Sequence, residues 1–281
     1  MPTNDAPLDR KTLLHNLELP QTPILELQRR IDLELADQEP KRKLLIPFVT
    51  CGYPTKAKTL DLLKACAAGG ADKIELGIPW SDPLADGPVI QETSRVALLS
   101  GTTMLDAFEI AAKFKDAPLL FMTYYNPVIQ FILPRFFNRA MKAGLKGVII
   151  PDLPPEESGD ARAAATMAGV PLIYLCSPTC TDARIRLIDR LSGDFIYLVS
   201  LRGVTGARSA VASDLGAFVK RVRRFTKKPL CVGFGISTPE QARDVARLAD
   251  GIIVGSAILK RAKNPRDVER FVRSLRKAIE G

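Results

Sequence analysis

The sequence predicts an α/β fold, a single (β/α)8 barrel, from three observations. Eight short apolar runs have the length of buried strands, and helical periodicity fills the intervals between them. Strand starts are separated by 28, 46, 29, 24, 24, 34 and 22 residues, close to the repeat of a strand–helix unit. A doubly wound open sheet is the alternative, but no G-x-G-x-x-G follows the first strand.

The predicted strands are bounded mostly by glycine, proline or aspartate. They cover residues 44–50, 72–78, 118–125, 147–152, 171–176, 195–200, 229–235 and 251–257. Helical periodicity is clear over residues 58–68, 155–168, 182–191 and 239–248. Near-continuous apolar strands are typical of strands buried on both faces, which favours a closed parallel barrel of the TIM type with its helices outside.

The intervals after the second and sixth strands are too long for one helix and two tight turns. The first contains SDPLADGP and two helical stretches, and the second contains RGVTGARSAVAS. Loops that follow barrel strands lie on the C-terminal face, where barrel enzymes place their chemistry. We therefore expect both long loops to form lids or walls of a site.

Residues 1–43 precede the first strand and are expected to form an N-terminal extension. An amphipathic helix is predicted over residues 24–36, where it would cap the lower mouth of the barrel, and the first twenty residues are expected to be loosely ordered. No further domain boundary is predicted, so residues 44–281 are expected to form one catalytic barrel.

Composition and charge narrow the functional class. The 281 residues carry a net charge of +9, from 40 Lys and Arg against 31 Asp and Glu. The basic residues fall in small groups without interleaved aromatics or a nucleic-acid motif, which indicates solvated helix faces and no nucleic-acid binding. No apolar run approaches the ~20 residues of a membrane helix, and the N-terminus lacks the pattern of a signal or transit peptide. We therefore expect a soluble, cytoplasmic protein.

Cysteine and histidine usage limits the chemistry further. Five cysteines, an odd number, are scattered through apolar segments, which predicts buried structural thiols in a reducing compartment. Cys176 and Cys180 are spaced C-x3-C, but no second pair or nearby histidine completes a metal site, and no metal is expected. The single histidine, His15, lies in the extension, which argues against Ser-His-Asp, Cys-His and histidine acid–base catalysis.

Two carboxylates form the only acid–base pair that the sequence offers. In the second strand, alternation places the aliphatic residues on one face and turns Glu75 toward the barrel interior, where burial should raise its pKa. A structural ion pair inside the barrel is the alternative for this residue. Asp86 lies eleven residues further, in a loop where Asp82 and Asp86 could also be structural caps. Two carboxylates in different environments can divide acid and base roles at neutral pH.

Glycines follow the last three strands and predict an anion site. GVTG, which contains Gly206, follows the sixth strand; GFGIS, with Gly233 and Gly235, ends the seventh; GSA, with Gly255 and Ser256, ends the eighth. Glycine lets backbone N–H groups approach an anion, and a short helix starting near Ser256 would add its positive dipole end. Each glycine alone is often only a turn, but phosphate sites built from the loops after strands seven and eight recur among barrels.

The sequence resembles a known family, the tryptophan synthase alpha subunits. The resemblance runs from about Leu44 to the C-terminus. It is carried, in order and spacing, by PFVTCGYP, IELGIPWSDPLADGPVIQ, YYNP, PDLPPEES, VSLRGVTGAR, GFGISTPEQ and DGIIVGSAIL. The departures are the long N-terminal extension, the basic net charge, and Trp80 where the family usually has Phe or Tyr.

The resemblance implies a lyase of L-tryptophan biosynthesis that cleaves indole-3-glycerol phosphate to indole and glyceraldehyde-3-phosphate by a retro-aldol reaction. It implies that Glu75 is the general acid–base residue, that Asp86 interacts with the indole N–H, and that Tyr197 lies near the catalytic glutamate. The other implied roles are an indole pocket (Phe48, Tyr124), a phosphate grip (Gly206, Gly235 and Ser256, with Gly233 and Gly255 beside them) and a loop facing a beta subunit (Pro79, Asp82).

The same resemblance implies an αββα assembly with a beta subunit that carries pyridoxal phosphate, and no cofactor in this chain. Two other functions stay open: a free-standing indole-glycerol-phosphate lyase, and a catalytically silent subunit that only activates the beta chain. The intact Glu75, Asp86 and glycines count against the silent subunit. No predicted strand ends in the lysine that a Schiff-base aldolase needs, since Lys73 lies at the start of its strand.

Overall fold

The computed structural model describes residues 42–199, 208–233 and 235–281, with the side chains of residues 208–213 excepted. The chain divides into two compact units, Met1–Arg42 and Lys43–Gly281, and the second contains the barrel. The helix predicted over residues 24–36 and the glycine at position 206 lie outside the described residues, so the expectations for them stay predictions.

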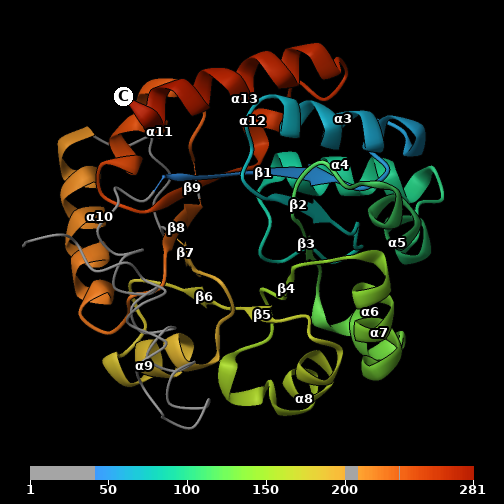
Figure 1. Cartoon of the computed structure of the whole chain (residues 1–281), viewed down its shortest axis with the longest axis horizontal. Coiled ribbons are helices and arrows are strands. Elements are labelled where there is room, and N and C mark those ends of the chain that lie inside the picture. The colour runs from blue at the N-terminus through green and yellow to red at the C-terminus, as the bar shows by residue number, and fades with distance from the viewer. Residues whose placement is uncertain (1–41, 200–207, 234) are drawn as a thin grey trace, which may run out of the picture. The chain divides into compact units, whose positions relative to one another are not determined.

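Parallel strands form a nearly closed barrel with helices on its outside (Figure 1). The order around the sheet is β5-β4-β3-β2-β1-β9-β8-β7-β6, so neighbours in sequence are neighbours in space except where β1 meets β9. The strands are β1 (Leu44–Thr50), β2 (Ile74–Gly77), β3 (Leu119–Met122), β4 (Gly147–Ile149), β5 (Leu172–Ile173), β6 (Leu175–Cys176), β7 (Ile196–Val199), β8 (Leu230–Gly233) and β9 (Gly251–Val254). This confirms the predicted TIM barrel.

The fifth predicted strand is interrupted at Tyr174, which separates β5 from β6. The two halves pair with different neighbours, β5 with β4 and β6 with β7, and the chain itself bridges the ends of the sheet. The backbone of Tyr174 remains satisfied because its N–H donates to Ser192 Oγ at 3.1 Å and its carbonyl accepts from Tyr197 N at 3.1 Å. Its hydroxyl donates to Ser158 Oγ at 2.6 Å, so the side chain points outward to the helices.

Alternation along the strands divides the core in two. One cluster lies in the barrel interior and is made of Ile46, Leu120, Ile149, Ile173, Phe195, Tyr197, Cys231 and Ile253. The larger cluster lies between the barrel and its helices, and it includes the β2 residues Ile74 and Leu76. Since neighbours in a strand face opposite sides, Glu75 between them points inward, as the alternation predicts.

The surrounding helices begin at predictable caps. Side chains of Thr55, Thr103, Thr181, Thr238 and Asn264 each accept a backbone N–H in the first turn of a helix. The helices are α3 (Lys56–Ala68), α4 (Pro88–Leu99), α5 (Met104–Lys113), α6 (Tyr125–Gln130), α7 (Leu133–Ala143), η1 (Pro155–Glu157), α8 (Gly159–Ala168), α9 (Asp182–Leu191), α10 (Arg208–Arg223), α11 (Pro239–Ala246), α12 (Ser256–Leu259) and α13 (Pro265–Glu280).

One boundary differs from the sequence expectation. The segment RGVTGARSAVAS was expected to be a long loop, but α10 begins at Arg208 within it. The long interval after β7 therefore reflects a 16-residue helix as much as a loop. The other long interval does contain two helices, α4 and α5, after the loop that carries Asp86.

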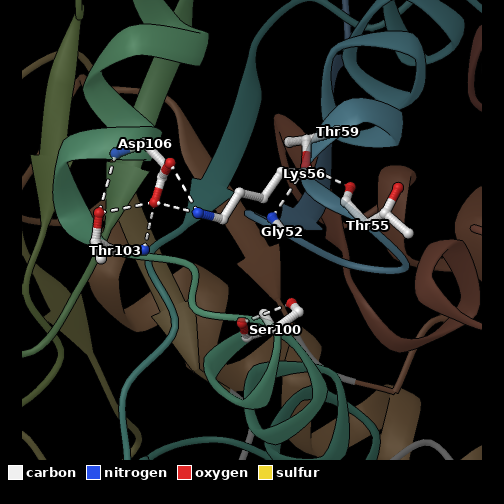
Figure 2. A network of polar contacts seen from close by, with 8 residues as sticks. Gly52, Thr55, Lys56, Thr59, Ser100, Thr103 and Asp106 are labelled. Atoms are coloured by element: carbon white, nitrogen blue, oxygen red, sulfur yellow. Dashed lines mark hydrogen bonds and ion pairs between the residues drawn. The ribbon is translucent and has the colours of Figure 1, made fainter.

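A polar network fixes the loop after β1 against the start of α5 (Figure 2). Lys56 Nζ lies 3.0 Å from the Asp106 carboxylate, which also accepts from Thr103 N at 2.7 Å. Gly52 donates its N–H to Thr59 Oγ1 at 2.9 Å. Gly52 has φ +84°, and a Cβ there would lie 2.0 Å from Thr102 Oγ1, so only glycine fits this turn. The network holds in place the C-terminal end of β1, which forms part of the site described next.

Candidate active site

A cavity of about 490 Å³ opens at the C-terminal ends of the barrel strands. Its walls come from β1, β2, β3, β7 and β9, the loops after β2, β8 and β9, the first turn of α4, and α12 with the turn that follows it. The lining residues are Phe48, Glu75, Ala85, Asp86, Gly87, Ile90, Met122, Tyr197, Gly235, Ile236, Ser237, Ile253, Gly255, Ser256, Ala257, Lys260 and Arg261. A concave, mainly apolar pocket with a few converging polar groups is the usual form of a small-molecule site.

Glu75 is the most unusual group in this cavity. The residue is fully buried, and neither carboxyl oxygen has a hydrogen-bond partner among the described residues. Burial, with a smaller contribution from the charge of Asp86, raises the pKa of Glu75 to about 8. The carboxyl is therefore mostly protonated at neutral pH and ready to donate a proton into the cavity.

Asp86 faces the same cavity from the loop after β2. The loop is held by a turn in which Asp86 N donates to Pro83 O at 3.0 Å, and by Ala85 N, which donates to Tyr124 Oη at 2.9 Å. Burial raises the pKa of Asp86 to about 6, against a lowering effect of its hydrogen bond with Tyr124. At neutral pH the Asp86 carboxyl is mostly ionised. Glu75 and Asp86 therefore differ in protonation state although they line the same cavity.

The raised pKa of Glu75 predicts how stability depends on pH. The folded state holds its proton up to about pH 8, whereas an exposed glutamate loses it near 4.5, so stability falls as pH rises between these values. Relative to wild type, Glu75→Gln should therefore gain stability by on the order of 1 kcal/mol for each pH unit across this window. Urea unfolding of both proteins at several pH values measures the difference. A difference independent of pH would show that Glu75 titrates normally.

Tyr197 lies on the inward face of β7 and lines the same cavity as Glu75. Burial and the nearby charges of Glu75 and Asp86 raise its pKa well above the ordinary value, so its hydroxyl stays protonated. Gly233 makes room for it, because a Cβ there would lie 2.4 Å from Tyr197 Oη. Gly77 likewise makes room for the Phe48 ring, because a Cβ at position 77 would lie 2.3 Å from Phe48 Cζ.

The opposite end of the cavity is suited to an anion. Gly235 has φ +72°, a left-handed conformation, and its backbone lines the cavity together with Gly255 and Ser256, where α12 begins. Lys260 and Arg261 add two positive charges to the same wall. Arg261 is held by a hydrogen bond from Nη1 to Ala257 O at 2.7 Å and by stacking of its guanidinium 3.8 Å from the centroid of the Phe271 ring.

The structure brings together most of the residues that the sequence singled out. The cavity wall contains Phe48, Glu75, Asp86, Tyr197, Gly235, Gly255 and Ser256. The remaining described residues of the predicted set lie elsewhere. Tyr124 supports the Asp86 loop through its hydroxyl, Gly233 packs against the Tyr197 ring, and in the loop after β2 Pro79 is buried whereas Asp82 is exposed.

Sequence reasoning missed the two cations and part of the apolar wall. Lys260 and Arg261 directly follow the GSAIL segment, so a search one helical turn beyond the predicted anion site would have found them. Ile90 and Met122 line the apolar part, and nothing in their local pattern distinguishes them from core residues. Among the described residues, no group of three or more His, Cys, Asp or Glu side chains could hold a metal ion. The same part of the chain contains no helix long and apolar enough to cross a membrane.

Comparison with known proteins decides the family. The family model described as tryptophan synthase alpha chain matches residues 35–280. The tryptophan synthase alpha chain of Dehalococcoides mccartyi is 47% identical over 252 residues, which cover 88% of this chain and 99% of that protein. The chain belongs to the tryptophan synthase alpha chain family.

Further members of the tryptophan synthase alpha chain family agree in sequence and in structure. The Geobacter sulfurreducens alpha chain is 44% identical over 85% of this chain and 94% of its own length. The crystal structure of tryptophan synthase subunit alpha from Legionella pneumophila superposes with a TM-score of 0.79 at 34% identity, covering 90% of this chain and 97% of that one. The chain is thus a lyase with the alpha-subunit role in tryptophan biosynthesis, and its family implies a beta-subunit partner.

Proposed function

We propose that the cavity cleaves indole-3-glycerol phosphate to indole and glyceraldehyde-3-phosphate, with Glu75 as the proton carrier. The observation that supports this best is the pairing of a buried, protonated Glu75 with an ionised Asp86 in one cavity. The apolar wall of Phe48, Ile90 and Met122 suits the indole ring, and the glycine-lined wall with its cations suits the phosphate.

The chemistry needs only these two carboxyl groups. Protonated Glu75 gives its proton to indole C3, and the positive charge that develops on the ring nitrogen is stabilised by the Asp86 carboxylate, which accepts the indole N–H. Glu75, now ionised, takes the proton from the hydroxyl on the carbon bonded to C3. The C–C bond then breaks, a carbonyl forms on glyceraldehyde-3-phosphate, and the electron pair returns to the ring. Glu75 ends protonated, ready for the next turnover.

Tyr197 and the phosphate wall act as orienting groups in this scheme. The protonated Tyr197 hydroxyl and Glu75 line the same cavity, and the hydroxyl would favour the charged form of Glu75 after proton transfer. Backbone N–H groups of Gly235 and Ser256, together with Lys260, would hold the phosphate while the far end of the substrate reacts. No metal or cofactor takes part in this proposal.

We further propose that the loop after β2 docks on the beta subunit of an αββα assembly, where that partner supplies pyridoxal phosphate. Leu84 in this loop is 91% exposed, and Leu99, which is 75% exposed, lines a groove of about 470 Å³ together with Trp80 and Pro83. Large apolar side chains gathered on one surface are typical of interaction sites. Pro79 and Asp82 belong to the same loop, and Asp86 follows them directly, so a partner bound here would act on the position of a reacting group.

Indole release from indole-3-glycerol phosphate, with and without a beta subunit, tests both proposals. We expect slow release by the chain alone and at least ~10-fold faster release with the partner, which corresponds to ~1.4 kcal/mol of coupling. Leu84→Ser should reduce the stimulation and leave release by the chain alone unchanged, whereas Met167→Ser, at a site 90% exposed on α8, should change neither.

Equal rates with and without the partner would favour a free-standing lyase. No release under either condition would favour a subunit that only activates its partner and would overturn the proposed chemistry.

A further inference from the structure

Two cysteines lie at the end of β6, the second half of the interrupted fifth strand, and the lyase chemistry does not use them. Cys176 ends β6, and Cys180 lies in the turn that follows, closed by Cys180 N donating to Ser177 O at 3.0 Å. Both thiols contact Ser177, whose carbonyl accepts from Cys176 Sγ at 3.9 Å and whose N–H and hydroxyl face Cys180 Sγ. All five cysteines are free and buried, as the sequence predicts, but these two are not isolated structural thiols.

The turn supplies hydrogen-bond donors to the sulfur of Cys180. Ser177 N donates to Cys180 Sγ at 3.4 Å, and Ser177 Oγ lies 3.6 Å from the same atom. Such donors stabilise a thiolate more than a thiol. The neighbouring Cys176 thiol and these Ser177 donors lower the pKa of Cys180.

Charged groups from three neighbouring elements face this turn. Arg184 on α9 lowers the pKa of Cys180 by its positive charge, and it pairs with Glu156 of η1 at 2.8 Å. Arg221 on α10 donates to Pro178 O at 3.1 Å and to Cys180 O, and it pairs with Asp182 of α9 at 3.0 Å. The two arginines favour negative charge at the turn and also fix the backbone that carries Cys180.

Cys180 is reachable from outside, whereas Cys176 is not. Cys180 is 8% exposed and lines a pocket of about 450 Å³ with Glu156, Thr181 and Arg184, while Cys176 is fully buried behind it. The other three cysteines provide a contrast: Cys51, Cys66 and Cys231 are buried, and burial raises the pKa of each.

We propose that Cys176 and Cys180 form a redox-active dithiol that is oxidised by a small organic disulfide entering this pocket. The Cys180 thiolate attacks one sulfur of the small disulfide, whose S–S bond breaks and releases one thiolate. Cys176 then loses its proton and displaces the second thiolate from Cys180, which forms the Cys176–Cys180 disulfide. Two protein thiols are oxidised and one small disulfide is reduced to two thiols. This reaction is independent of the lyase chemistry.

Alkylation of the full-length folded chain with iodoacetamide, followed by peptide mapping, tests the thiolate. The Cys180 rate at pH 6 should remain close to its rate at pH 8.5, whereas the rate of an ordinary thiol falls roughly 100-fold over this range. The ratio of rates does not depend on how freely the reagent reaches the sulfur. A roughly 100-fold fall for Cys180 would overturn the proposal.

Incubation of the same protein with oxidised glutathione tests the pairing. Wild type should lose two hydrogen atoms, keep no glutathione and show a Cys176–Cys180 link. Cys176→Ser should accumulate glutathione on Cys180, Cys180→Ser should form neither product, and the matched control Cys66→Ala should behave as wild type.

Wild-type protein whose two thiols both stay alkylatable after this treatment, or glutathione spread without preference over the cysteines, would also overturn the proposal. Both results come from wild type, so they hold even if a variant fails to fold.

Discussion

Replacing Glu75 by Gln is expected to lower the turnover of indole-3-glycerol phosphate by roughly 10²–10⁴-fold. The substitution preserves the shape of the side chain but removes the proton that Glu75 holds at neutral pH because burial raises its pKa to about 8. Steady-state indole release measures the loss.

The binding of glycerol-3-phosphate provides the control for Glu75→Gln. Its affinity should change little, because the phosphate wall around Gly235 and Ser256 is built from other strands than β2. Unchanged binding with collapsed turnover separates a catalytic role from general damage to the fold. Near-wild-type turnover would remove Glu75 from the mechanism, and the second acid of the cavity, Asp86, would become the candidate.

The second large effect is expected at Gly235, from a comparison of Gly235→Asp with Gly235→Asn. Both side chains tolerate the left-handed conformation at φ +72° better than most residues, and they are nearly equal in size. Only Asp adds a negative charge beside the proposed phosphate. At an effective dielectric constant near 20, a carboxylate about 5 Å from the anion costs about 3 kcal/mol, on the order of 100-fold in affinity.

Calorimetric titration with glycerol-3-phosphate measures this difference between the two Gly235 variants. The Asn variant reports the cost of any side chain at this position, and the additional loss in the Asp variant reports the charge alone. Equal affinities of the Asp and Asn variants would place the phosphate at another part of the cavity, away from Gly235, Ser256 and Lys260.

The sequence alone was sufficient to predict the barrel and the orientation of Glu75. Both depend on local regularities: strand length and spacing predict the repeated units, and period-two alternation decides which side chains face inward. The same alternation explains why Tyr197 and Cys231 share the interior with aliphatic residues. The glycine segments after the last strands were also recognisable locally, because a left-handed residue such as Gly235 needs a glycine where it occurs.

Other features depend on which distant segments meet when the barrel closes. Tyr124 was expected in the indole pocket, but its hydroxyl supports the backbone of Ala85, 39 residues away in sequence. Gly233 was expected at the phosphate, and its lack of a side chain accommodates the ring of Tyr197 on the neighbouring strand. The break at Tyr174 arises in the same way, since the two halves of one strand pair with different neighbours.

The protonation states of the carboxyl and thiol groups were likewise decided by the tertiary structure. The sequence determined the chemical types, two carboxyl groups near one strand end and two thiols four residues apart. Only the folded chain determines that Glu75 is buried without a partner, which raises its pKa, and that Cys180 receives hydrogen bonds, which lower its pKa. A pKa reflects the solvation and charges that surround a group in space, and those are contributed by segments that the local pattern of the sequence does not bring together.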